Sequence, residues 1–439
     1  MADDTKILTK YWDDPDLHHI ESYISHGGYE GLRKALFDMS PQEIIDEVIK
    51  ANLRGRGGAG FPAGRKWSFI PKDPSLEKYV LCNADEGEPG TFNNRELMER
   101  NPHQLIEGCL IAAYAIGATR AFILIRGEYR LPANVLEDAI AEAYAKGIAG
   151  SNAMGSGKEL HILLQRGAGS YEVGEETALI ECMEGSRGNP RTRPPFPAIK
   201  GLYQKPTVVN NVETLCNAPH ILLNGAEWFA GIGAPSCPGT KFFSLSGNVA
   251  KPGNYEMPMG TTFRQLLEIG GGVPNGRKVQ AIMLGAAPPM LNGDQLDVNA
   301  DIDSVQKVGS QLGSGSVIYI DDSWCMIDVT LRAASFFHHE SCGKCTPCRE
   351  GTGWMHKIVD RIANGLGRRE DIDLLLDICD NIAGKSLCAL GEFSTGPILS
   401  SIKHFRDHYE EHIRTGTCQL RRSSFERHAG AAQPVLVAS

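Results

Sequence analysis

The spacing of four cysteines constrains this chain more than any other feature of its sequence. Cys342, Cys345 and Cys348 form a Cys-x-x-Cys-x-x-Cys run, and Cys388 follows 40 residues later. Two intervening residues let a short turn direct successive thiolates at one inorganic core, and a remote fourth thiolate completes the coordination sphere. The pattern predicts an iron–sulfur cluster and hence electron transfer. Structural zinc, which usually uses two separated Cys-x-x-Cys pairs, is the competing interpretation.

Length and charge narrow the class of protein further. With 439 residues the chain exceeds the size at which one hydrophobic core keeps growing, so two or three domains are expected. Hydrophobic residues make up 42% and charged residues 22%, as in globular proteins. The net charge of −9 provides no basic field for a phosphate backbone, so we do not expect nucleic acid as a partner.

The sequence shows neither a secretory signal nor a membrane span. Asp3 and Asp4 stand where a signal peptide needs positive charge, and Glu107 and Arg120 interrupt the most apolar stretch. We therefore expect a cytoplasmic chain with no direct membrane insertion. In a reducing compartment, cysteines without ligand spacing are interpreted as structural or incidental thiols. These are Cys82, Cys109, Cys182, Cys216, Cys237, Cys325, Cys379 and Cys418.

Alternating strands and helices predict a Rossmann-like α/β domain with a mostly parallel sheet over residues 1–236. Helices are expected between Asp16 and Lys50, the second opening at Ser40-Pro41, a strong helix-start signal. A shift in composition at Pro235–Gly239 indicates a linker. The expected strands are 78–83, 121–126 and 160–164, and the expected helices are 104–116 and 136–145.

Two smaller domains are expected after this linker. Over residues 237–325 the order of strand, turn, strand, helix and strands is that of a β-grasp (ubiquitin-like) fold. Residues 326–415 follow a helical period and predict a helical bundle that carries the cysteine triplet. Residues 416–439 have no apolar period and predict a flexible tail. Within the β-grasp domain the expected elements are strands 241–247, 279–284 and 317–320 and a helix at 263–269.

Two glycine-rich segments indicate a binding site in the α/β domain. Residues 54–64 contain too many glycines for a helix or strand, so the backbone there is expected to approach a phosphate or flat ring. The spacing is not the G-x-G-x-x-G dinucleotide fingerprint, and a flexible surface loop is the alternative. In the second segment, Gly167–Thr177, Tyr171 can cover an aromatic face. Glu175 and Glu176 there are also compatible with a simple helix start.

Six segments, taken together and in order, resemble one family. It is the NADH-binding, flavin-bearing subunit of respiratory complex I (NADH-quinone oxidoreductase), known as the F subunit or the 51 kDa subunit. The resemblance covers roughly residues 20 to 415 and rests on several independent motifs. The segments are 55–64, 83–90, 167–177, 193–197, 206–214 and 340–349.

The resemblance implies FMN, one [4Fe–4S] cluster, and NADH/NAD+ as substrate. No side chain is expected to act as a covalent catalyst, because the cofactors supply the hydride chemistry. The cluster ligands would be Cys342, Cys345, Cys348 and Cys388. The NADH-binding residues would be Gly55, Arg56, Gly57, Gly58, Ala59 and Gly60 in the first loop, Phe61, Phe69 and Phe196 around the adenine, and Glu88, Glu176 and Arg193. The residues that hold FMN would be Lys66, Asn83, Asp85, Tyr171, Glu175, Asn210, Asn211 and Thr214, with Glu86 and Gly174 in the same cofactor-binding set.

The resemblance also implies partners. An E-type, thioredoxin-like [2Fe–2S] subunit and a G-type, large iron–sulfur subunit would carry single electrons onward to quinone. The chain would then lie peripherally on the cytoplasmic face of the membrane. The closest alternative is the diaphorase subunit of a soluble NAD-linked hydrogenase or formate dehydrogenase. Such chains often carry additional domains, for which neither residues before 20 nor those after Cys388 leave room or cysteines. A zinc-stabilised scaffold protein without redox activity is the alternative from another class.

Overall fold

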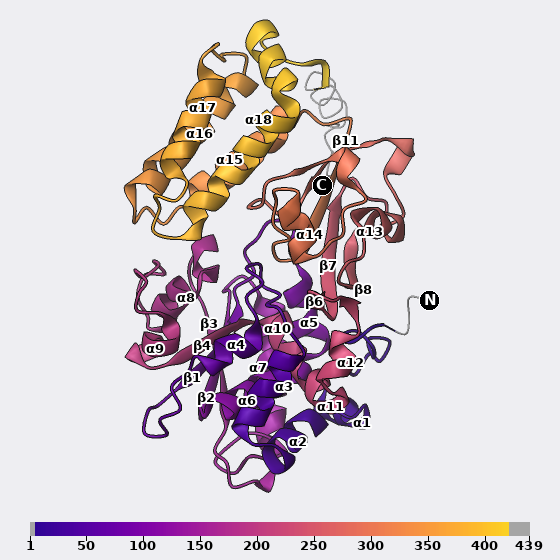
Figure 1. Ribbon diagram of the computed structural model, residues 1–439, viewed down its shortest axis with the longest axis vertical. Helices are drawn as coiled ribbons and strands as arrows, with labels where there is room; N and C mark the ends of the chain where they lie inside the picture. The colour runs from indigo at the N-terminus through magenta and orange to yellow at the C-terminus, as the bar shows by residue number, and fades with distance from the viewer. Residues whose placement is uncertain (1–4, 421–439) are drawn as a thin grey trace, which may run out of the picture.

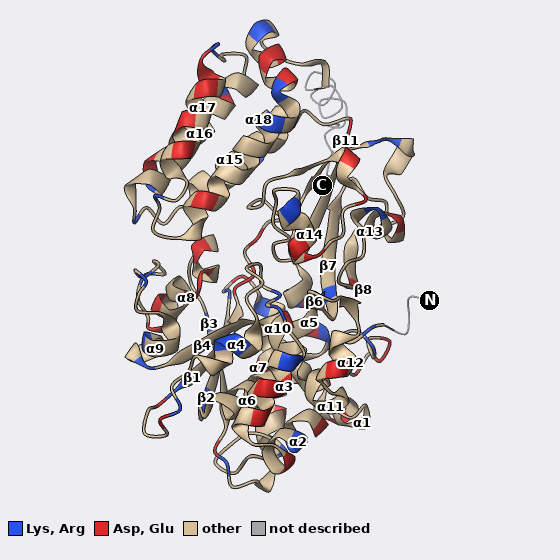
Figure 2. Cartoon of the chain, in the orientation of Figure 1, with Lys and Arg blue, Asp and Glu red and all other residues tan. Residues whose placement is uncertain are grey.

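The computed structural model describes residues 5–420 and contains three units that follow one another along the chain. Figure 1 shows the α/β unit at the bottom, the β-grasp unit above it on the right, and the helical bundle above it on the left. Charged residues of both signs are distributed over all three units (Figure 2). Within the described residues, no helix is long and apolar enough to cross a membrane. The predicted fold class is confirmed.

The α/β unit is built on a parallel sheet of four strands in the order β3-β2-β1-β4. The strands are β1 (Tyr79–Ala84), β2 (Arg120–Ile125), β3 (His161–Arg166) and β4 (Thr207–Asn211). The helices are α1 (Ile20–Ser25), α2 (Glu30–Asp38), α3 (Pro41–Lys50), α4 (Ala63–Ser68), α5 (Asn93–Arg100), α6 (Pro102–Ile116), α7 (Arg130–Ala145), α8 (Glu176–Met183), α9 (Pro197–Lys200), α10 (Val212–Cys216), α11 (Ala218–Asn224) and α12 (Ala226–Ala230).

Local sequence signals explain where these helices begin. Ser40 caps α3 with a complete capping box that includes Glu43, and Pro41 occupies the first turn, as predicted. The apolar helix α6 is buried along almost its whole length, so the most apolar stretch of the sequence forms core. Helix α7 begins at Arg130, six residues before the predicted start at Leu136, so that prediction is wrong. Pro132 lies in the first turn of α7, where a missing backbone N–H costs little, so it does not delay the helix.

The strand order creates a switch point between β1 and β4. Successive strands β1, β2 and β3 extend to one side, whereas β4 returns to the other side of β1. Ligands of open α/β sheets bind outside the carboxyl ends of strands at such a point. Asn83 of β1 lies beside Asn211 of β4 at this edge. No strand was predicted at β4, because five residues give too short an apolar pattern to identify.

The second unit has the predicted β-grasp topology. Its sheet order is β10-β9-β11-β7-β8, in which the first and last long strands, β7 and β11, lie parallel at the centre. The neighbouring pairs β7–β8, β9–β11 and β9–β10 are antiparallel. The elements are β7 (Thr240–Gly247), β8 (Gly253–Pro258), α13 (Phe263–Ile269), β9 (Val279–Met283), β10 (Leu291–Asn292), α14 (Ile302–Lys307) and β11 (Ser316–Asp321).

The segment predicted as a linker is a partly buried joint between the first two units, in which Pro235 and Ser236 are exposed. The short strands β5 (Gly233–Ala234) and β6 (Cys237–Pro238) pair with each other, and Cys237 is fully buried. Beside them, Lys241 of β7 forms an ion pair with Glu213 of α10, and both side chains are almost completely buried. The compositional shift at residues 235–239 therefore marks a unit boundary held by packing and charge.

The third unit is a helical bundle of α15 (Met326–Glu340), α16 (Thr346–Ala363), α17 (Asp371–Ile382) and α18 (Ala389–Thr415). After α18 the chain reverses at Gly416, whose φ of 79° is in the left-handed region. Cys418 then returns to the bundle core and is 4% exposed. The prediction that a flexible tail begins at residue 416 is therefore wrong. The rest of that prediction, residues 421–439, lies outside the described residues.

Candidate flavin, NADH and iron–sulfur sites

Several predicted residues meet at the switch point of the sheet. At the end of β1, the Asn83 side chain donates a hydrogen bond of 2.8 Å to the carbonyl oxygen of Gly174 and accepts one of 3.1 Å from the Asp85 N–H. The Asn210 side chain of β4 accepts a hydrogen bond of 2.8 Å from the Trp67 indole of α4. The second glycine-rich segment and helix α4 thus flank the same strand ends.

The first glycine-rich loop lies directly over the carboxyl end of β4. It folds back on itself through a hydrogen bond of 3.0 Å from the Gly55 N–H to the Phe61 carbonyl oxygen. The Arg56 N–H donates to the Thr214 hydroxyl at 2.8 Å. A Cβ atom on Gly57 would lie 2.8 Å from the Cβ of Asn211, so a side chain at this position would clash. The backbone at Gly57 therefore approaches Asn211 closely, while its approach to a phosphate or flat ring stays a prediction.

The Arg56 side chain is directed toward the β-grasp unit and not toward the carboxyl ends of β1 and β4, the region where a ligand crevice is expected. Its guanidinium is buried and donates a hydrogen bond of 2.6 Å to the Pro238 carbonyl oxygen of the β-grasp unit and one of 3.3 Å to the Arg54 carbonyl oxygen. This side chain secures the loop to the neighbouring unit, and its contact with a cofactor stays a prediction. Its acceptors are two backbone carbonyl groups and, at 3.6 Å, the Cys237 Sγ, so no local sequence pattern indicates this role.

Charged side chains border the crevice between α4 and α8. Lys66 lies 2.7 Å from Glu176, and Arg193 lies 3.1 Å from the same carboxylate. Burial works to raise the pKa of Glu176, but the two cations outweigh it and hold that pKa below its usual value. Glu175 accepts hydrogen bonds from the N–H groups of Thr177 and Ala178 and caps α8, which confirms the interpretation as a helix start.

Three aromatic rings are exposed beside these charges. Phe61, Phe69 and Phe196 have exposed fractions of 49%, 55% and 57%. The rings of Phe61 and Phe69 have centroids 6.0 Å apart. Phe69 follows Lys66 by three residues and Phe196 follows Arg193 by three, so the shared contacts with Glu176 bring the two segments together. Grouped exposed aromatic rings offer a surface on which a flat ring can stack.

Two residues of the acidic loop after β1, Asp85 and Glu86, have different surroundings. Burial raises the pKa of Asp85 to about 7, against the opposing effect of Arg126. Glu86 accepts four hydrogen bonds, from the Asn94 and Arg95 N–H groups, the Asn94 amide and the Tyr129 hydroxyl. These contacts fill the acceptor positions of its carboxylate, so Glu86 holds the start of α5, and its cofactor contact stays a prediction.

Glu88 connects the second glycine-rich segment to the β-grasp unit. It accepts a hydrogen bond of 2.5 Å from the Tyr171 hydroxyl and bonds of 2.6 and 3.0 Å from the Ala286 and Ala287 N–H groups. Burial raises the pKa of Glu88, although these hydrogen bonds oppose the shift. Glu88 therefore positions Tyr171, which the sequence predicted as a flavin contact.

The four predicted cluster ligands surround one hollow. Cys345 directly precedes α16, Cys348 lies in its first turn, and Cys388 directly precedes α18. Gly343, with a φ of 74°, makes the turn between the first two thiols. Burial raises the pKa of both Cys348 and Cys388 to about 11. The hollow is lined by Cys342, Cys345, Cys348 and Cys388 together with Pro190, Ser341, Gly343, Lys344, Leu387 and Leu390.

The spacing of these sulfur atoms bears on the choice between an iron–sulfur cluster and a zinc ion. Tetrahedral zinc, with bonds of about 2.3 Å, holds its sulfur ligands about 3.8 Å apart. Among the described residues, no three of these four sulfurs lie within 4.8 Å of one another. A wider arrangement around a common hollow suits a multi-iron core, whose irons each take a separate thiolate. The donor set therefore fits a four-iron cluster better than a zinc ion.

The second glycine-rich segment, which contains Tyr171, directly contacts the unit that holds the cysteine hollow. The Tyr171 N–H donates a hydrogen bond of 2.8 Å to Glu340 at the end of α15, and its ring packs against Phe336 at 5.2 Å between centroids. Tyr171 also packs against the hydrophobic cluster that contains Cys348. The Lys344 ammonium group donates a hydrogen bond of 2.6 Å to the Pro190 carbonyl oxygen. The two sites are thus adjacent parts of one structure.

Comparison with protein-family models assigns each unit. Residues 48–220 match the Nuo51 FMN-binding domain, residues 242–295 match the SLBB domain, and residues 328–412 match the NADH-ubiquinone oxidoreductase-F iron-sulfur binding region. The first match contains the glycine-rich crevice, and the third contains the four-cysteine hollow. The flavin-binding and iron–sulfur regions expected from the sequence are confirmed.

Whole-chain comparisons agree with these assignments. The chain is 50% identical to the F 2 subunit of the NADH-quinone oxidoreductase of Rhizobium meliloti, over 94% of this chain and 98% of the relative. It is 48% identical to the F subunit of the NADH-quinone oxidoreductase of Streptomyces coelicolor, over 94% and 92% of the two chains. A solved structure of an air-oxidised NAD+-reducing [NiFe]-hydrogenase contains a similar chain, with a TM-score of 0.80 and 35% identity over 93% of this chain and 67% of that one. The chain therefore belongs to the family of NADH-quinone oxidoreductase F subunits.

Proposed function

We propose that this chain is the NADH-oxidising entry subunit of an NADH-quinone oxidoreductase. The observation that carries the proposal is the direct packing of the Tyr171 segment, at the edge of the crevice, against the unit that holds the four-cysteine hollow. When bound, FMN accepts an electron pair as hydride from NADH and a [4Fe–4S] cluster takes electrons one at a time. The protein's part is to orient nucleotide and flavin and to keep the cluster close to them.

We propose that different residues of the crevice bind FMN and NADH. FMN would be held at the switch point by side chains at the ends of β1 and β4, namely Asn83, Asp85, Asn210 and Asn211; their position at this edge of the sheet supports the proposal. Thr214, whose hydroxyl anchors the glycine-rich loop, belongs to the same group. The exposed rings of Phe61, Phe69 and Phe196 are suited to the adenine of NADH. Arg193 would supply positive charge for its anionic groups, and Glu176, which contacts both Arg193 and Lys66, would lie at the NADH end. Lys66 and Glu175 belong with the residues that would hold FMN.

The proposed partners receive single electrons from the cluster. They are a thioredoxin-like [2Fe–2S] protein of the E type and a large iron–sulfur protein of the G type, which lead to quinone. The chain would then lie at the cytoplasmic face of the membrane through the complex. Support comes from the relatives, which are named as F subunits of NADH-quinone oxidoreductases.

A second candidate function is that of the diaphorase subunit of an NAD-linked hydrogenase. It is favoured by the structural match to a chain of the NAD+-reducing [NiFe]-hydrogenase. The respiratory assignment has stronger support. The chain is 50% identical to the Rhizobium meliloti subunit and covers 98% of it, whereas it is 35% identical to the hydrogenase chain and covers 67% of that chain. Mass spectrometry of the subunits that co-purify after gentle detergent extraction, with assay of NADH-dependent quinone reduction, tests the choice. Recovery of hydrogenase subunits without quinone reduction would reject the respiratory role.

Replacing Phe61 by alanine should weaken NADH binding while leaving the FMN content unchanged. Stacking of a base on an aromatic side chain is worth ~1–3 kcal/mol, so KM for NADH should rise about tenfold or more. The measurement is NADH–ferricyanide activity together with FMN released per chain on denaturation. Phe37→Ala is the matched control, because Phe37 is also half-exposed but lies on α2. Equal losses of flavin and NADH affinity in Phe61→Ala would contradict the placement.

FMN affinity should increase with pH through Asp85. Its pKa of about 7 leaves the carboxyl largely protonated at pH 6 and ionised at pH 8. A carboxylate accepts hydrogen bonds from flavin hydroxyl groups, so binding favours the ionised form. The apparent dissociation constant should then fall about tenfold from pH 6 to pH 8 and level off above that range. Fluorescence titration of flavin-depleted chain measures this dependence.

Asp85→Asn provides the control for this pH effect. An amide can accept a hydrogen bond but does not titrate in this range, so the variant should lose the Asp85 contribution. The flavin phosphate titrates equally in both proteins and cancels in the comparison. If wild type and variant show the same pH dependence, Asp85 does not face the flavin.

A further inference from the structure

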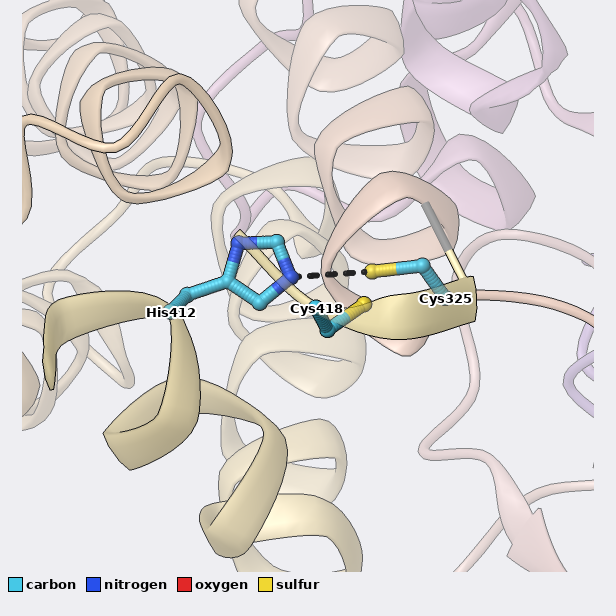
Figure 3. A group of neighbouring side chains, drawn as sticks. All are labelled: Cys325, His412 and Cys418. Atoms are coloured by element: carbon cyan, nitrogen blue, oxygen red, sulfur yellow. Dashed lines mark hydrogen bonds between the residues drawn. The ribbon is translucent and has the colours of Figure 1, made fainter. Parts of the chain in front are cut away.

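We propose that Cys325, His412 and Cys418 form a second metal site that binds a zinc ion. Figure 3 shows the imidazole and the two thiol groups directed toward one another. The three side chains are buried, with exposed fractions of 3% for Cys325, 0% for His412 and 4% for Cys418. This inference is independent of the proposed flavin chemistry, because none of the three residues belongs to the crevice or the cluster hollow.

The distances match those of a tetrahedral zinc site. The Cys325 Sγ lies 3.3 Å from the His412 Nε2, and all three potential ligand atoms lie within 4.8 Å of one another. Bonds of about 2.3 Å to sulfur and about 2.0 Å to nitrogen place the ligand atoms of a tetrahedral ion about 3.6–3.8 Å apart. Small adjustments of the side chains would therefore bring all three into bonding distance.

The imidazole is already oriented as a ligand. Its Nδ1 lies 3.3 Å from the Ile362 carbonyl oxygen. A proton on Nδ1 can donate to that oxygen, which leaves the lone pair of Nε2 directed at the two sulfur atoms. Metal-binding histidines commonly use their second nitrogen in this way. Two thiolates with one imidazole are a donor set that zinc prefers over magnesium or calcium.

The fold brings together residues that are distant in the sequence. Cys325 precedes α15 directly, and His412 lies in the last turns of α18. The left-handed turn at Gly416 then reverses the chain so that Cys418 faces back toward both. No Cys-x-x-Cys spacing marks this site. The proposed site replaces the interpretation of Cys325 and Cys418 as incidental thiols.

The proposed ion would close the bundle at the end opposite the cluster. It would join the residue before the first bundle helix to the segment after the last one. Helix α15 has 15 residues and spans about 22 Å at 1.5 Å per residue, and the triplet follows its far end. The site is therefore too distant to share ligands with the cluster. Three protein ligands leave a fourth position for water, and the expected role is structural.

Metal analysis of the complex purified anaerobically from zinc-containing medium tests the proposal. Plasma mass spectrometry should show that Cys418→Ser and His412→Gln each contain one zinc fewer per copy of this chain than wild type, with iron unchanged. Cys379→Ala is the matched control, because Cys379 is a buried thiol in the same bundle core that packs against Met355. This variant should retain the zinc.

A second measurement covers the case in which the ligand variants fail to fold. X-ray absorption at the zinc edge of wild-type protein, measured against the Cys379→Ala control, should show sulfur scatterers at about 2.3 Å and an imidazole. Zinc contents that are equal in wild type and both ligand variants would overturn the proposal. So would recovery of Cys325 and Cys418 as a disulfide in wild-type protein that lacks the extra zinc.

Discussion

Replacing Cys388 by alanine should remove the iron–sulfur cluster while FMN stays bound. Cys388 supplies the remote thiolate at the start of α18, and its loss leaves one iron without a protein ligand. The residue lies outside the region that matches the FMN-binding domain, so the flavin crevice should remain intact. We expect iron to fall by about four atoms per chain. NADH-dependent quinone reduction should fall to background, whereas NADH–ferricyanide activity should persist because an artificial oxidant can take electrons from the flavin.

Cys379→Ala serves as the control for this experiment, because it removes a buried thiol from the same bundle without changing the hollow. It should retain iron, flavin and quinone reduction. Iron content and quinone reduction that survive in Cys388→Ala would show that this residue is not a cluster ligand. Loss of FMN together with iron would show that the two sites do not fold independently.

Replacing Lys241 by methionine should cause the largest loss of stability. The Lys241 ammonium group is paired with Glu213 in the joint between the α/β and β-grasp units, and the two side chains are 1% and 0% exposed. Without Lys241 the buried Glu213 carboxylate loses its ion-pair partner, although the charge of Arg56 and a hydrogen bond from the Phe242 N–H remain. Removing one member of such a pair costs about 3–5 kcal/mol of unfolding free energy. Denaturant-induced unfolding of the full chain measures the change.

Two further variants make the Lys241 result specific. The double variant Lys241→Met/Glu213→Gln removes both charges and should recover much of the loss. Lys251→Met changes an exposed lysine of the same unit and should shift stability by less than about 0.5 kcal/mol. A Lys241→Met protein as stable as Lys251→Met would contradict the role of this ion pair.

The parts of the fold that were predicted correctly depend on local patterns. The meeting of Cys342, Cys345, Cys348 and Cys388 around one hollow was expected from their spacing, whereas their role as cluster ligands stays a prediction. The β-grasp unit was identified from the order of its strands and helix, and Ser40 marked the start of α3 through its capping box. Each of these signals lies within a short stretch of chain, and tertiary packing did not override it.

The parts that were missed depend on tertiary partners. The partners that hold the Arg56 and Glu86 side chains, beside β6 and at the start of α5, could not be predicted from the motifs in which these residues stand. Strand β4 is too short to identify without the neighbouring β1. Cys325 is 87 residues from His412, so no local spacing predicts their contact. The identity of FMN came from resemblance to a family, because glycine-rich loops alone do not specify a flavin.

The most direct test of NADH-driven cluster reduction is an anaerobic titration of the oxidised complex with NADH. Visible absorbance follows the flavin, and electron paramagnetic resonance follows the cluster coordinated by Cys342, Cys345, Cys348 and Cys388. We expect the flavin band to bleach and the signal of this reduced [4Fe–4S] cluster to appear in wild type. In Cys388→Ala the flavin should still bleach, but the signal should be absent. A colourless chain that contains zinc without iron at these cysteines, and does not oxidise NADH, would contradict the assignment.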